Sequence, residues 1–234
     1  MSTKSLPRIG ILGGMGPMAG VALQKLIINL TPAERDQDHR DVICFTHASI
    51  PDRATSLEED GGRAYLSAFR ESFRALERAG ADVIGIPCNT AHARFKEFAR
   101  TTDVPLVNII TETIESMALA VPRGSAVGIL GTTSLINLNV YPNHDAEKRF
   151  SWMTPNDRAQ QNIARMILDV KAGKTVDARE LDEHIKLLAS AGAAGVIIGC
   201  TELSLLYDAI AAPPVPVVDS LQSLCGALLA WRKR

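Results

Sequence analysis

Short runs of Val, Ile and Leu alternate along the chain with longer stretches in which apolar residues recur at helical spacing. The short runs predict strands at Ile9–Leu12, Asp41–Ala48, Asp82–Ile86, Leu106–Ile109, Ala126–Leu130, Gly195–Ile198 and Val215–Val218. Most of them are almost continuously apolar, which is typical of parallel strands covered on both faces. The longer stretches predict helices that include Tyr65–Ala79, Ala159–Ala172, Ala178–Ala191 and Leu221–Ala230. This alternation of strands and helices predicts an α/β fold.

Three strand-like segments occur twice, in the same order and at nearly constant spacing. The pairs are Gly10–Gly13 with Gly128–Gly131, Gly80–Cys88 with Gly192–Cys200, and Val104–Val107 with Val215–Val218. We therefore predict two similar parallel-sheet α/β halves related by pseudo-twofold symmetry, with the active site between them. The predicted first half is residues 1–110 plus 214–234, and the predicted second half is residues 111–213.

Cys88 and Cys200 each end the corresponding strand of their half. Ligands of open α/β sheets bind beyond the carboxyl ends of the strands, so we expect these thiols to approach one small ligand from opposite sides. Each precedes a predicted helix start, which favours an anion and is expected to lower the pKa of the thiol. Cys44 and Cys225 lie inside a strand and an apolar helix and are predicted to be packing residues. Free thiols are expected throughout.

Composition narrows the class of protein. The 234 residues are 46% hydrophobic and 22% charged, as in globular proteins of one large or two small domains. Lys plus Arg number 25 against 26 Asp plus Glu, so no basic surface for nucleic acid or a membrane is expected. No apolar run reaches the roughly 18 residues of a membrane span, and residues 1–8 contain no signal-peptide core. We expect a cytoplasmic location.

Two further motifs bear on whether the chain binds a dinucleotide or a metal. Gly14-Met15-Gly16, followed by Ala19, fits a dinucleotide fingerprint, which would indicate a nicotinamide or flavin enzyme. The second predicted strand does not end in the acidic residue that this fingerprint needs, so a tight turn near a small anion is the favoured interpretation. Pro17 is then expected at the first position of a helix. Cys88 and His92 lack a second ligand pair, so no metal site is predicted.

Six segments together resemble the aspartate/glutamate racemase superfamily, and its aspartate racemase branch in particular. They are Ile9–Pro17, Thr31–His39, Ile50–Arg53, Pro87–His92, Val170–Gly173 and Gly199–Glu202. Cell-wall glutamate racemases are less similar, since they carry Asp-Ser-Gly near the start and Cys-Thr-His in the second half. This chain has Gly-Gly-Met and Cys-Thr-Glu at those places.

The resemblance implies an isomerase that racemises aspartate, or glutamate, by proton transfer at Cα between two thiols, without pyridoxal phosphate, any other cofactor or metal. Cys88 and Cys200 match the catalytic acid/base pair. Arg53 and Lys171 match residues that hold the side-chain carboxylate of the substrate. The other positions matched to substrate binding are Met15, Asn89, Thr90, Thr132, Thr133 and Thr201.

The same resemblance implies a homodimer whose partner molecule is an acidic amino acid. Three alternatives remain open on the residues alone. Two are enzymes of the same superfamily, a maleate-isomerase-like enzyme and a decarboxylase. The third is a non-catalytic protein that binds an amino acid.

Overall fold

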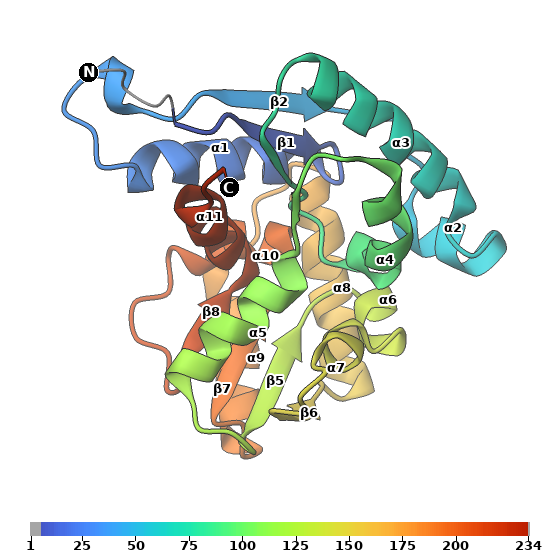
Figure 1. Ribbon diagram of the computed structural model, residues 1–234. Helices are drawn as coiled ribbons and strands as arrows, with labels where there is room; N and C mark the ends of the chain where they lie inside the picture. Colours follow the sequence, from blue (N-terminus) through green and yellow to red (C-terminus); the bar gives the residue numbers. More distant parts are fainter. Residues whose placement is uncertain (1–5, 234) are drawn as a thin grey trace. The chain divides into compact units, whose positions relative to one another are not determined.

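The computed structural model describes residues 6–233 (Figure 1), and contacts between residues divide it into two compact units. Unit 1 comprises the described residues of Met1–Pro87, Arg94–Asn108 and Leu224–Arg234. Unit 2 comprises Cys88–Ala93 and Ile109–Ser223. Among the described residues, no helix is both long and apolar enough to cross a membrane.

Unit 1 is built on a four-stranded parallel sheet in the order β2-β1-β3-β4. Its strands are β1 (Ile9–Gly13), β2 (Val42–Thr46), β3 (Val83–Gly85) and β4 (Leu106–Val107). Its helices are α1 (Pro17–Leu30), η1 (Asp36–Asp38), α2 (Arg53–Glu59), α3 (Arg63–Arg78), α4 (Phe95–Phe98), η3 (Ala99–Thr101) and most of α11 (Ser220–Ala230). Helices α1 and α3 pack against β1 and β2, and the predicted Pro17 begins α1.

Unit 2 contains a second four-stranded parallel sheet, in the order β6-β5-β7-β8. Its strands are β5 (Ala126–Leu130), β6 (Ser151–Met153), β7 (Gly195–Ile198) and β8 (Val217–Asp219). Its helices are α5 (Ile109–Ala120), α6 (Thr133–Asn137), α7 (Val140–His144), α8 (Asp157–Lys171), α9 (Ala178–Ser190) and α10 (Thr201–Tyr207). Figure 1 shows α5 on the near side of this sheet and α8 and α9 on its far side.

The two sheets have the same strand order, second-first-third-fourth, counted along each unit. The segments that repeat in the sequence form the first, third and fourth strands of each sheet. The fold is therefore the predicted α/β architecture of two similar halves. The strand that the sequence did not predict is β6, which contains only Ser151, Trp152 and Met153.

The boundaries of the units differ from the predicted ones at residues 88–93, 109–110 and 214–223, which belong to unit 2 and not to the first half. Strand β8 was assigned to the first half, but it pairs with β7 in the sheet of unit 2. The Cys88–Ala93 segment follows β3 of unit 1 directly in the chain, yet its contacts group it with unit 2. The covalent order therefore does not determine the unit to which these residues belong.

Close packing in both units depends on strand glycines. A Cβ atom added at Gly85 would lie 2.7 Å from Leu228 Cδ1 within unit 1. In unit 2, a Cβ atom added at Gly128 would lie 2.8 Å from Leu188 Cδ1. Each glycine therefore lets an apolar helix residue approach the backbone of the sheet.

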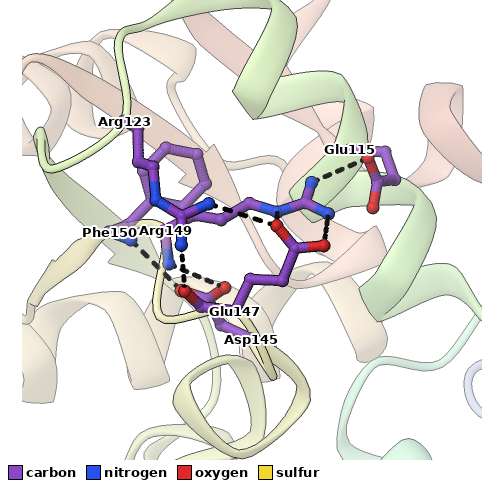
Figure 2. Close-up of polar contacts among 6 residues, drawn as sticks. All are labelled: Glu115, Arg123, Asp145, Glu147, Arg149 and Phe150. Atoms are coloured by element: carbon purple, nitrogen blue, oxygen red, sulfur yellow. Dashed lines mark hydrogen bonds and ion pairs between the residues drawn. The ribbon is translucent and has the colours of Figure 1, made fainter.

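A polar cluster holds the loop that leads into β6 in unit 2 (Figure 2). Both carboxylate oxygens of the buried Asp145 accept backbone hydrogen bonds, from Arg149 N at 3.0 Å and Phe150 N at 3.2 Å. The Arg149 guanidinium reaches Glu115 of α5 at 2.7 Å and Glu147 at 3.0 Å. These contacts fix a short strand whose own sequence is a weak strand signal.

Candidate active site

Asn89 is buried in unit 2, and both its amide nitrogen and its amide oxygen make hydrogen bonds. Its Nδ2 donates to Ser220 Oγ at 2.9 Å, and its Oδ1 accepts from the Tyr141 hydroxyl at 2.8 Å. Ser220 is the first residue of α11 and directly follows β8, and Tyr141 lies on α7. All three side chains are buried. This part of the Cys88–Ala93 segment is therefore attached to the carboxyl end of β8.

Thr90 attaches the same segment to a different strand end. The hydroxyls of Thr90 and Thr132 lie 2.9 Å apart and share a hydrogen bond. Thr132 comes shortly after β5 and caps the start of α6, where its Oγ1 accepts from Leu135 N at 3.1 Å. The segment that begins at Cys88 thus contacts residues beyond the carboxyl ends of both β5 and β8.

Strand β7 lies between β5 and β8 in the sheet, and Cys200 follows it as the capping residue of α10. Because parallel strands point the same way, their carboxyl ends share one edge of the sheet. The Cys88–Ala93 segment, which contacts residues on both sides of β7 at this edge, is therefore on the same side of unit 2 as Cys200.

His92 fixes the backbone of Cys88. Its Nδ1 donates to the Cys88 carbonyl oxygen at 2.8 Å, since a carbonyl can only accept. Complete burial lowers the pKa of His92 to about 3, against a small opposing effect of this hydrogen bond. His92 is therefore a neutral structural residue at ordinary pH. The helix that follows Cys88 is a 3₁₀-helix, η2 (Thr90–Arg94), rather than the predicted α-helix start.

The environment of Cys200 differs from the expected one. Its Sγ donates a hydrogen bond of 3.0 Å to Glu202 Oε2. Burial, followed by the charge of Glu202 and this hydrogen bond, raises the pKa of the Cys200 thiol well above its usual value, and Lys171 opposes the rise. The prediction of a lowered pKa is wrong for Cys200, because burial and a neighbouring carboxylate outweigh the helix start.

The other predicted residues of unit 2 have different surroundings. Thr201 is buried as the first residue of α10. Lys171 is the exposed last residue of α8, and its charge acts on Cys200. Thr133 is exposed and its Oγ1 accepts from Gln160 Nε2 at 3.3 Å. Thr133 therefore contacts Gln160 of α8.

Met15 and Arg53 belong to unit 1. Met15 is buried in the loop between β1 and α1. Gly14 before it has φ +106°, and an added Cβ would overlap with the carbonyl oxygen of His47. Arg53 begins α2 and is buried, and its Nη1 donates to the carbonyl oxygens of Ile50 at 3.4 Å and Pro51 at 3.1 Å. The Ile-Pro-Asp-Arg motif is thus a compact turn that orients a guanidinium.

The remaining cysteines are packing residues, as predicted. Cys44 lies within β2, and Cys225 is completely buried in α11, where burial raises the pKa of its thiol to about 11. All four thiols are free. Over residues 6–233, no three His, Cys, Asp or Glu side chains gather in a way that could hold a metal ion.

Three site residues were not identified from the sequence: Tyr141, Glu202 and Ser220. Glu202 had a usable signal, because a carboxylate two residues after a strand-end cysteine can reach its sulfur. Tyr141 and Ser220 had none, since only the tertiary fold brings them to Asn89.

Comparison with known proteins identifies the family of the chain. The family model described as Asp/Glu/Hydantoin racemase matches residues 12–228. Broad specificity amino-acid racemase RacX of Bacillus subtilis is 26% identical over 227 residues, which cover 91% of this chain and 92% of the relative. These matches extend over nearly the whole chain and include both units.

Two solved structures are similar over almost their full length. Aspartate racemase of Picrophilus torridus has a TM-score of 0.81 at 28% identity, with 95% of this chain and 93% of that chain covered. An aspartate racemase homologue from Pyrococcus horikoshii has a TM-score of 0.77 at 27% identity, with 96% and 98% covered. The chain belongs to the Asp/Glu/Hydantoin racemase family, a family of amino-acid isomerases.

Proposed function

We propose that this protein racemises aspartate or glutamate without a cofactor, using Cys88 and Cys200 as a two-base pair. The observation that supports the pairing is the attachment of the Cys88–Ala93 segment to residues following β5 and β8. Cys200 follows the strand between them. Two thiols at one sheet edge can serve the same substrate carbon.

The reaction requires one thiolate and one thiol. The thiolate removes the proton from Cα, and the thiol delivers a proton to the opposite face of the carbanion. Because the roles exchange in the reverse direction, the protonation states belong to the pair. The carbanion needs electrostatic stabilisation as it forms. Asn89, Thr90 and Thr201 are the polar groups proposed to hold the α-carboxylate and amino group.

An acidic substrate is proposed from the cationic residues. The guanidinium of Arg53 can bind a carboxylate with two parallel hydrogen bonds, which a neutral side chain would not satisfy. Lys171 supplies a second positive charge whose effect reaches Cys200. Aspartate and glutamate differ by one methylene, which a pocket distinguishes by only about 1–3 kcal/mol. Both are therefore proposed as substrates.

The test is incubation with each enantiomer of aspartate, glutamate and alanine in D₂O without added cofactor, followed by chiral chromatography and mass spectrometry. We expect the opposite enantiomer to form and to carry deuterium at Cα. Cys88→Ala and Cys200→Ala are each expected to abolish interconversion, and Cys225→Ala serves as the matched control. Racemisation that survives loss of Cys88 or Cys200 would exclude the two-base mechanism. Racemisation would be excluded if the amino acid bound without gaining deuterium at Cα, or if the product were not the opposite enantiomer.

The family resemblance extends the proposal to a homodimer in the cytoplasm. Light scattering coupled to gel filtration measures the mass of the assembly. Fractionation of cells that produce the protein measures its location. A monomeric mass or a membrane-bound fraction would contradict these two parts of the proposal.

A further inference from the structure

The Cys200–Glu202 contact joins a reactive sulfur directly to a carboxylate. Sγ and Oε2 are 3.0 Å apart, and both residues are at least 95% buried, with exposed fractions of 5% each. An ionised carboxylate can only accept a hydrogen bond, so the sulfur in this geometry carries the proton. Cys200 caps α10 and Glu202 lies in its first turn, so the backbone of one short element holds both groups.

Three groups with charge or a titratable proton interact electrostatically with Cys200 from separate helices: Glu202 on α10, Lys171 at the end of α8 and Tyr141 on α7. Glu202 favours the protonated thiol, and Lys171 favours the thiolate. Burial raises the pKa of Tyr141, so its hydroxyl stays neutral. Burial also favours the protonated thiol, and Glu202 is the charged group that adds to this effect by direct contact with the sulfur.

We propose that Glu202 is a positioning residue that keeps Cys200 as the thiol in the substrate-free protein, so that Cys88 acts as the base in the first proton abstraction. The inference rests on the proposed racemase function. In the step, the C–H bond breaks and its proton passes to the Cys88 sulfur. The S–H bond of Cys200 breaks as its proton bonds to the opposite face of Cα, and the electron pair stays on the Cys200 sulfur.

This assignment has a consequence for the end of the step. The new Cys200 thiolate lies beside the Glu202 carboxylate, and two like charges at hydrogen-bond distance repel each other. Return to the starting state requires Cys200 to gain a proton and Cys88 to lose one, either by exchange with solvent or in the reverse reaction. Repulsion between Glu202 and the Cys200 thiolate favours this return.

The first test uses the unmodified protein, so it does not depend on whether a variant folds. The protein is alkylated with iodoacetamide over a range of pH, and the labelling of each cysteine is followed by peptide mapping. Both residues are buried, and the pH midpoint of each labelling curve is compared instead of the rate, because the midpoint reports formation of the thiolate independently of access. We expect Cys88 to be labelled at lower pH than Cys200. Labelling of Cys200 at the same or lower pH would overturn the proposal.

The second test removes the charge. Glu202→Gln keeps the size of the side chain and a hydrogen-bond acceptor, so the pH midpoint of Cys200 labelling should fall by about one to three units. Glu202→Asp keeps the charge and should leave the midpoint closer to that of the wild type. Asp208→Asn removes the same charge at the other end of α10 and should leave it unchanged. An unchanged midpoint in Glu202→Gln would overturn the proposal.

The kinetic readout separates this inference from the proposed function. In an active racemase, the alkaline limb of kcat/KM against pH should move in Glu202→Gln in the same direction as the labelling midpoint. If Glu202→Gln is active but its pH midpoint of Cys200 labelling is unchanged, the proposed role of Glu202 is overturned and the proposed racemase function is not. Absence of racemisation in the wild type overturns the proposed function, whereas the labelling experiment still reports whether Glu202 holds the proton on Cys200.

Discussion

The hydroxyl of Tyr141 donates a hydrogen bond of 2.8 Å to Oδ1 of Asn89, and both side chains are buried. This bond fixes which way the Asn89 amide points, because Nδ2 must then face Ser220. The proposed substrate ligand is thus oriented by a residue that comes from a helix far along the chain.

Tyr141→Phe should therefore affect both stability and substrate binding. Loss of the donor leaves a buried amide oxygen unpaired, which lowers the free energy of unfolding by about 1–3 kcal/mol. Because Asn89 is then free to reorient, KM for the acidic amino acid should rise more than kcat falls. Urea denaturation and steady-state kinetics measure these effects. Tyr207→Phe, on the partly exposed end of α10, is the control and should stay within about 0.5 kcal/mol of wild type. Equal behaviour of the two variants would contradict the role of Tyr141.

Arg53→Leu should change the substrate preference. Hydrogen bonds to a charged group contribute about 1.5–3 kcal/mol, so kcat/KM for aspartate should fall about ten- to a hundredfold. Alanine has no side-chain carboxylate, so its kcat/KM should change far less. Both substrates are measured with the same Arg53→Leu protein. Any general loss of activity caused by losing the contacts with Ile50 and Pro51 therefore affects both equally. A parallel loss for both substrates would show that Arg53 only supports its own turn.

Asp219 should make stability depend on pH. It accepts from Ser204 Oγ at 2.6 Å and from Leu221 N at 2.9 Å, yet burial raises its pKa from 3.8 to about 6. The folded protein holds this proton more tightly than the unfolded chain does. The Asp219 contribution therefore falls as pH rises from about 4 to about 6, by up to about 3 kcal/mol, and is constant above that range.

Urea denaturation of the wild type and of Asp219→Asn across this range isolates the effect, because all other carboxyl groups titrate in both proteins. The free energy of unfolding of the wild type should decline relative to that of Asp219→Asn as pH rises. Asp103→Asn, at an exposed position whose charge does not act on Asp219, should run parallel to the wild type. Parallel curves for Asp219→Asn would refute the raised pKa.

Gly14→Ala should destabilise unit 1 more than a comparable change elsewhere. Gly14 has φ +106° and its added Cβ meets the His47 carbonyl, whereas Gly61 has φ +69° and open space around it. Gly61→Ala should cost only the left-handed conformation, about 1–2 kcal/mol. Gly14→Ala should cost more than twice as much, as measured by urea denaturation. Similar losses in the two variants would show that the loop moves to accommodate the side chain.

Much of the architecture could be predicted because strands buried on both faces have a distinctive composition. The repeated segments identified six strands of the two sheets, and the amphipathic periodicity identified α3, α8 and α9 to within two residues. Strand β6 could not be predicted, because its three residues have little strand propensity of their own. The contacts of Asp145 and Arg149 hold the strand in place, and the local sequence does not reveal them.

The candidate site was predictable only in part. Cysteines at strand ends are visible as sequence motifs, whereas the partners that orient the neighbouring amide come from α7 and α11. The predicted direction for the pKa of Cys200 is wrong, because burial and Glu202 outweigh the helix start and the extent of burial is not visible in the local sequence pattern. Tertiary surroundings, rather than the identity of the residue, decide the protonation of this thiol.

The carboxylate next to Cys200 cannot make kcat/KM differ between the two directions of racemisation. Mirror-image amino acids have the same free energy in water, so their equilibrium ratio is one and kcat/KM must be equal for both. A carboxylate that biases the resting protonation state cannot alter this equality. It can make kcat differ between the two enantiomers only if KM differs by the same factor, so the two saturation curves would rise with one initial slope and level off at different heights.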